Sequence, residues 1–77
     1  MHNNLAPMIG QRIRLARREQ GLRQDELALA SGVSTRAVHQ VEAGKPTSRL
    51  DIVVSILTAL GLTLDVVDAP RGTFDGS

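Results

Sequence analysis

The sequence of 77 residues contains no cysteine, tryptophan or tyrosine, and Phe74 is its only phenylalanine. The lack of cysteine excludes both a disulfide framework and a thiolate metal site. Proteins that bind single-stranded nucleic acid or RNA stack the bases on several exposed aromatic rings. The scarcity of rings therefore argues against that mode of binding.

Long apolar runs are also missing. No stretch reaches the roughly 18 apolar residues of a membrane-spanning helix, and the first residues lack the basic and then apolar pattern of a secretory signal. We therefore expect a cytoplasmic protein with no membrane partner. A chain of this length has room for one domain and buries only about 60% of the surface that its unfolded form exposes, so it gains stability by oligomerising.

Groups that would support catalysis are scarce as well. The sequence offers no arrangement of nucleophile and base and no glycine-rich phosphate loop. Asp25 and Glu26 are adjacent carboxylates, but they open an expected helix, where the helix dipole explains them better than acid–base chemistry. His2 and His39 lie far apart in the sequence, with no cysteine to complete a ligand set. We predict no enzymatic activity, no metal site and no cofactor.

Charge is distributed unevenly along the chain. Residues 1–49 contain eight Lys or Arg against four Asp or Glu, a net charge of +4, whereas residues 50–77 contain one against four, a net charge of −3. A basic first part followed by an acidic end suits a face that binds a polyanion. For the arginines between Arg12 and Arg18, a solvated helix face is an equally good explanation.

Residues 24–44 predict two short helices joined by a tight turn. The first carries Leu27, Ala28 and Ala30 on its inward side, and the glycine at position 32 ends it. Ser34 is a good cap for a second helix that starts at residue 35. This arrangement is the helix-turn-helix, which presents its second helix to the major groove of DNA.

Three further elements surround this unit. A helix is expected from Pro7 to residue 20, and another over 49–60, capped by Ser48 with Asp51 three residues on. The helix over 49–60 carries two apolar stripes and must be covered on more than one side, which we assign to a second copy of the chain. Residues 62–68 alternate as a strand does, and a lone strand needs a partner for its backbone groups. The alternative is an extended tail lying on the core.

These patterns predict an all-α helix-turn-helix domain of four to five helices, with a short C-terminal β-strand that pairs across a homodimer. We divide the chain into a frayed start (1–6), the DNA-binding domain (7–61), the strand (62–68) and a flexible tail (69–77) that contains Phe74. The predicted dimer interface consists of Ile52, Ile56, Ala59, Leu62, Leu64 and Val66.

The stretch IGQRIRLARREQGLRQDELALASGVSTRAVHQVEAGK resembles the Xre/Cro family of helix-turn-helix repressors, which have the lambda-repressor fold. Within that family, KPTSRLDIVVSILTALGLTLDVVDA is similar to the HipB antitoxins, in which a fourth helix precedes a strand that pairs across the dimer. The resemblance implies a bacterial repressor on the nucleoid, bound as a homodimer to an inverted repeat in double-stranded DNA. It also implies a second partner, a HipA-like serine/threonine kinase toxin. The alternatives are a regulator of the Xre type without a toxin, and a protein–protein adaptor that no longer binds DNA.

The expected DNA-binding residues lie mainly on the second helix of the motif. Arg36 is the candidate for bidentate recognition of guanine, although a phosphate or an acidic neighbour would also suit it. Gln40 lies one turn later and suits adenine. Thr35 can contact a thymine methyl group or a phosphate, and His39 can contact a phosphate. Ser34 is expected to cap the helix first and to contact a phosphate second.

The resemblance assigns further roles. It implies that Gln24 holds a phosphate and braces the second helix, that Lys45 contacts a phosphate, and that Arg17 and Glu42 form a structural salt bridge. Arg23 departs from the family, which has Thr, Ser or Asn there. Arginine is a poor helix cap, so Arg23 is expected to exchange capping energy for a phosphate contact.

Overall fold

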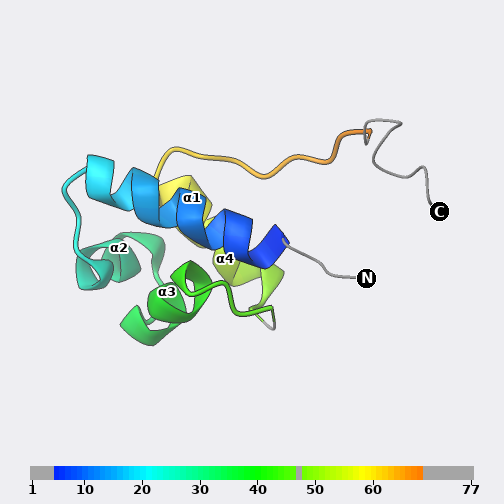
Figure 1. The fold of residues 1–77 in the computed structure, drawn as a ribbon. Helices are drawn as coiled ribbons and strands as arrows, with labels where there is room; N and C mark the ends of the chain where they lie inside the picture. Colours follow the sequence, from blue (N-terminus) through cyan, green and yellow to red (C-terminus); the bar gives the residue numbers. More distant parts are fainter. Residues whose placement is uncertain (1–4, 47, 69–77) are drawn as a thin grey trace.

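A computed structural model describes residues 5–46 and 48–68 of the chain, and in this part it consists of four helices and no strand. The predictions for residues 1–4 and for the tail 69–77 lie outside the described residues. Figure 1 shows α1 lying across the other helices. The helices are α1 (Leu5–Glu19), α2 (Gln24–Ser31), α3 (Thr35–Glu42) and α4 (Leu50–Ala59). None of them is both long and apolar enough to cross a membrane.

The helix-turn-helix is formed by α2 and α3, as the sequence predicted. The turn between them relies on Gly32, whose φ of +72° is a left-handed conformation that residues with a Cβ atom seldom adopt. One boundary differs from the prediction. Because α1 starts at Leu5, residues 5 and 6 belong to the helix and not to a frayed start, and Pro7 lies within the first turn.

Each helix contributes one fully buried side chain to the core: Ile13, Leu27, Val38 and Ile56. These four are surrounded by smaller or less completely buried apolar residues: Ala16, Ala28, Val41, Val53, Leu57 and Leu60. Ala30, predicted to point inward, is exposed, because the short α2 turns only Leu27 and Ala28 toward the core.

Gly10 allows α1 and α3 to approach closely. A Cβ atom at this position would lie 2.5 Å from the carbonyl oxygen of Val41 and 2.8 Å from that of Glu42. Both distances are shorter than any contact that a Cβ atom tolerates, so only glycine fits without movement of the backbone. The close approach fixes the C-terminal end of α3 against α1.

The buried side of α4 differs from the predicted one. Ile56 was assigned to an interface between subunits, but its side chain is completely enclosed by its own chain. Ile52 and Ala59 are half-buried and pack against the same core. The apolar side chains of α4 that remain exposed are instead Leu50 (66%) and Val54 (40%). The helix is apolar on most of its circumference, so its sequence alone did not distinguish the covered side.

The predicted cap of α4 is also wrong. Arg49 occupies the N-cap position, and the hydroxyl of Ser48 donates a hydrogen bond to the Lys45 carbonyl oxygen at 3.0 Å. Asp51 accepts hydrogen bonds from the Arg49 guanidinium and from the backbone N–H of Ile52, both at 2.8 Å. The carboxylate therefore acts locally and does not complete a capping box with Ser48.

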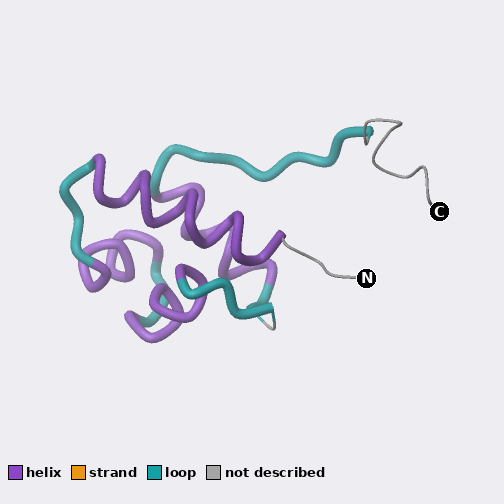
Figure 2. The backbone as a smooth tube through the Cα atoms, in the orientation of Figure 1, coloured by secondary structure: helices purple, strands orange, loops and turns teal. Residues whose placement is uncertain are grey.

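Residues 62–68, which we call the C-terminal arm, form an extended segment that follows α4. The structure assigns no strand to the arm in the single chain, since its backbone has no neighbouring strand to pair with (Figure 2). Leu62 is half-buried against the core, whereas Leu64 is 42% exposed and Val66 is 95% exposed. The strand predicted for these residues is thus absent from the isolated subunit.

Candidate nucleic-acid interface

The start of α3 is fixed by Ser34. The residue has an extended backbone, and its hydroxyl oxygen accepts a hydrogen bond from the Ala37 N–H at 3.0 Å. This contact satisfies one of the N–H groups that a helix leaves unpaired in its first turn. Ser34 therefore has the capping role that the sequence predicted, and Thr35 is the first helical residue.

The outward side of α3 is polar and accessible. Val38 and Val41 turn into the core, whereas Thr35, Arg36 and His39 are exposed and Gln40 is half-buried. Within the described part of the chain, neither Arg36 nor His39 makes an ion pair or a side-chain hydrogen bond. The donors on this face of α3 are therefore available to a ligand.

The C-terminal end of α3 is held by a buried ion pair. The Arg17 guanidinium donates two hydrogen bonds to the Glu42 carboxylate, Nε to Oε2 at 2.6 Å and Nη2 to Oε1 at 2.9 Å. The third donor of Arg17, Nη1, bonds the carbonyl oxygen of Leu22 at 2.8 Å. A bidentate pair of this kind fixes orientation as well as distance, so α3 keeps a defined angle to α1.

Two further side chains reach the same carboxylate. Gln24, at the start of α2, donates from Nε2 to Oε1 of Glu42 at 3.2 Å, and Nε of Arg14 lies 3.5 Å from that oxygen. Burial by itself raises the pKa of the Glu42 carboxyl, but the hydrogen bonds from Arg17 and Gln24 outweigh it and the pKa is lowered. Glu42 thus stays ionised and joins three helices. Arg14 was not among the residues predicted from the sequence, although its position three residues before Arg17 places both on neighbouring sides of one helix.

Arg23 and Lys45 flank the motif. Arg23 is the N-cap residue of α2, yet the cap is supplied by Glu26, whose carboxylate accepts from the Arg23 N–H at 2.8 Å. The exposed Arg23 guanidinium bonds Asp25 at 3.0 Å, and this hydrogen bond lowers the pKa of the Asp25 carboxyl. Lys45 is exposed just after the turn that ends α3. Both cations are therefore accessible, Arg23 at the start of α2 and Lys45 after the end of α3, with Arg23 already paired to an acidic neighbour.

Comparison with known proteins agrees with this geometry. Residues 13–67 match the family model described as "Helix-turn-helix". The chain therefore belongs to this family of helix-turn-helix proteins. It is similar to an uncharacterized HTH-type transcriptional regulator, y4mF, of Sinorhizobium fredii (strain NBRC 101917 / NGR234). The two are 46% identical over 59 residues, which is 77% of this chain and 78% of the relative.

Proposed function

We propose that this protein is a transcriptional repressor that binds a specific sequence in double-stranded DNA as a homodimer. The class follows from the helix-turn-helix family and from the relative that is named a transcriptional regulator. The observation that supports DNA binding most directly is the outward side of α3, with Arg36 and His39 exposed. Because α3 is capped at one end and held by Glu42 at the other, the helix that carries these side chains keeps a fixed position.

In this proposal, Arg36 recognises a guanine through O6 and N7, and Gln40 contacts a base one helical turn further along α3. Thr35 and His39 lie on the same side and complete the contact with the groove. Phosphates flanking the groove are bound by the remaining candidates: Arg23, Gln24, Ser34 and Lys45. Phosphate contacts supply most of the affinity and make it depend on salt.

The homodimer accounts for the apolar side chains that the single chain leaves uncovered. Of the predicted interface residues, Leu64 and Val66 are exposed, and Leu50 and Val54 of α4 join them. Ile56 is not proposed as an interface residue, since it is buried within its own subunit. A dimer of this kind places two copies of α3 in successive major grooves about 34 Å apart, on an inverted repeat.

Selection of bound duplexes from a random DNA library tests this function. We expect an enriched inverted repeat whose half-sites are separated by about one helical turn, 10–10.5 base pairs. Enrichment of a single half-site would contradict the dimeric arrangement. No enrichment over the starting library would contradict sequence-specific binding and would favour a protein–protein adaptor.

We also propose that the protein acts as the antitoxin of a HipA-like serine/threonine kinase. Support comes from the resemblance of residues 45–69 to the HipB antitoxins, which includes α4 and the arm. The test is an isothermal titration of this protein with a purified HipA-like kinase encoded beside it. Binding with inhibition of the kinase would support the antitoxin role, whereas no binding, or no such neighbouring gene, would indicate a regulator that acts without a toxin.

A further inference from the structure

The proposed DNA contact leaves an apolar surface of α1 without a role. Leu5, Met8 and Leu15 are 55%, 62% and 53% exposed, and they share one side of the helix at the spacing that a period of 3.6 residues brings together. Together with Ile9, Gln11 and Arg12, they line a shallow open hollow. We call this side of α1, residues Met8 to Leu15, the α1 face.

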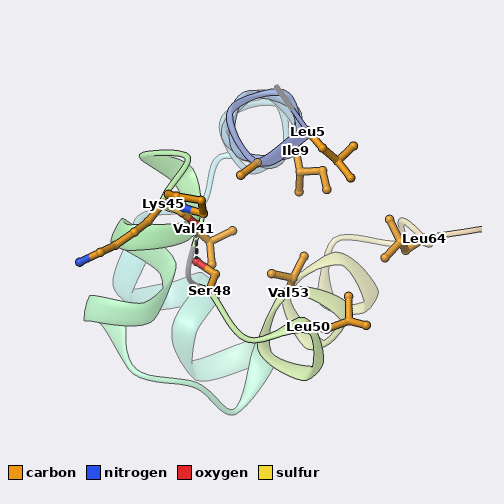
Figure 3. A pocket seen from close by; sticks show the side chains of 10 residues that line it. Leu5, Ile9, Val41, Lys45, Ser48, Leu50, Val53 and Leu64 are labelled. Carbon is orange, nitrogen blue, oxygen red and sulfur yellow. Dashed lines mark hydrogen bonds between the residues drawn. The ribbon is translucent and has the colours of Figure 1, made fainter. Parts of the chain in front are cut away.

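A second hollow continues the α1 face toward α4. It shares Leu5 and Ile9 with the first and extends across Val53 and Leu50. Figure 3 shows Leu5 and Ile9 on one side of this hollow, Val53 on the other, and Leu64 of the arm at its edge. Leu64 of the same subunit's arm thus lies at the edge of this second hollow, and Figure 1 shows the arm continuing past the N-terminal end of α1. Met8 and Leu15 stay exposed in the presence of this arm, so the α1 face is uncovered.

The arm itself carries side chains that its own subunit does not cover. Val66 is 95% exposed and Val67 is 75% exposed, and acidic residues at positions 65 and 68 flank them. The α1 face is complementary to the arm, because it is apolar and carries one basic residue, Arg12, where the arm carries acidic ones. Within residues 5–46 and 48–68, Arg12 and Asp68 each make no ion pair.

We infer that the C-terminal arm of a second copy of this chain docks on the α1 face, with Val66 covering Met8 and Asp68 pairing with Arg12. Side chains alternate along an extended segment, so Val66 and Asp68 point to the same side about 7 Å apart. Met8 and Arg12 lie four residues apart on a helix, about 6 Å along its axis. The two spacings match, and the symmetric exchange of arms covers both α1 faces of a dimer.

This inference rests on the homodimer in the proposed function, but it names a different contact from the pairing of two strands. In strand pairing the two arms bind each other and Arg12 is not involved. In arm docking the charge at position 12 decides how tightly the subunits associate. The two arrangements are therefore separated by variants on α1, far from the arm in sequence.

The test measures the monomer–dimer dissociation constant by sedimentation equilibrium in the absence of DNA. We expect Val66→Asp to raise that constant about tenfold or more, since it places a charge on an apolar surface. Val67→Asp is the matched control. Val67 is also exposed, and alternation along an extended segment turns it to the side opposite Val66, so we expect this variant to change the constant by less than about threefold. All the substituted positions are exposed, and circular dichroism verifies that the variants fold.

Exchanging the charges at positions 12 and 68 tests whether the arm binds the α1 face. Arg12→Glu is expected to weaken the dimer, and Asp68→Arg combined with Arg12→Glu is expected to restore it. The control is Arg18→Glu, an exposed arginine of α1 that lies outside the hollow. A dimer that is sensitive to Val66→Asp but indifferent to Arg12→Glu would overturn arm docking and leave the proposed function intact. A protein that stays monomeric at all concentrations would overturn both arm docking and the homodimer.

Discussion

Glu42 is the residue on which the placement of α3 depends. Its side chain is completely buried and accepts hydrogen bonds from Arg17 and Gln24. Removing one partner of a buried ion pair leaves the other charge without compensation, which costs far more than the pair contributes when intact. Loss of the Glu42 carboxylate is therefore expected to affect both stability and the placement of the side chains on the outward side of α3.

We predict that Glu42→Gln lowers the free energy of unfolding by about 3–5 kcal/mol, because the buried Arg17 loses its counter-charge. Urea denaturation followed by circular dichroism measures the change. Glu19→Gln is the matched control, since Glu19 is exposed and makes no ion pair in the described part of the chain. Equal stability of the two variants would show that the ion pair does not hold α3.

The lowered pKa of Glu42 makes the free energy of unfolding depend on pH. The pKa of this carboxyl is lower in the folded protein than its ordinary value of about 4.3. The folded state then binds fewer protons than the unfolded state near that pH, so the stabilisation is complete above it and is lost as the pH falls through the lowered pKa. The Asp25 carboxyl, paired with Arg23, has a lowered pKa and acts with the same sign.

We therefore expect the free energy of unfolding to be constant between about pH 6 and 7 and to decrease below about pH 5. Urea denaturation at a series of pH values measures it. Asp25→Asn removes the contribution of the exposed pair, and the decrease that remains belongs mainly to Glu42. A free energy of unfolding that rises on acidification would contradict the assigned ion pair.

Arg36 is the residue to which we assign base recognition. Arg36→Ala should cost about 1–3 kcal/mol in binding to the preferred DNA and should relax specificity at one base position. The contrasting variant is Lys45→Ala, which should weaken binding to all sequences alike and reduce the salt slope by about 1. Both are measured by titration against single-base variants of the selected sequence. Unchanged discrimination by Arg36→Ala would place Arg36 on a phosphate or in solution.

Among the helices, α1 and α3 approach each other closely because position 10 of α1 is a glycine. Gly10→Ala would improve helix propensity by up to about 1 kcal/mol, but its Cβ atom would collide with the carbonyl oxygens of Val41 and Glu42. Overpacking of this kind costs about 1–3 kcal/mol, so we expect a net loss of stability and weaker DNA binding. Thermal denaturation measures the loss, with the exposed Gln11→Ala as control. A variant as stable as the parent would mean that α1 moves away from α3 without cost.

The helix-turn-helix was predictable because its signals are local. Ser34, the glycine at position 32 and the spacing of Val38 and Val41 determine where α2 ends and where α3 begins and which side it buries. The same local signals predicted an all-α domain of four to five helices, of which the described part of the chain contains four, and the exposure of Arg36. The family resemblance added Arg17 and Glu42, whose contact joins residues 25 positions apart in the sequence, a separation that no helical period reveals.

The sides of α4 were not predictable in the same way. Seven of the ten positions of α4 are apolar, so the period of the sequence does not distinguish the side that meets α2 from the side that meets solvent. The structure buries Ile56 and exposes Leu50, the reverse of the interface predicted from the sequence. Arg14 and the α1 face were missed because their significance depends on what lies opposite them in space.

At the scale of the whole molecule, two different surfaces are left for partners. Figure 1 places α2 and α3 on one side of α1 and the C-terminal arm on the other. Arg36 and His39 are exposed on α3, and Val66 is exposed on the arm. The proposed DNA-binding surface and the proposed subunit interface can therefore be occupied at the same time, as the proposed repressor on an inverted repeat requires.

Recognition of a specific DNA sequence by α3 can be measured by fluorescence anisotropy. The protein is titrated against the duplex upstream of its own gene and against a scrambled duplex, each at two salt concentrations. We predict binding to the upstream duplex that is at least about a thousandfold tighter than binding to the scrambled duplex and that weakens as salt rises. Equal and weak binding to both duplexes would contradict sequence-specific recognition, and the exposed side of α3 would then serve a partner other than DNA.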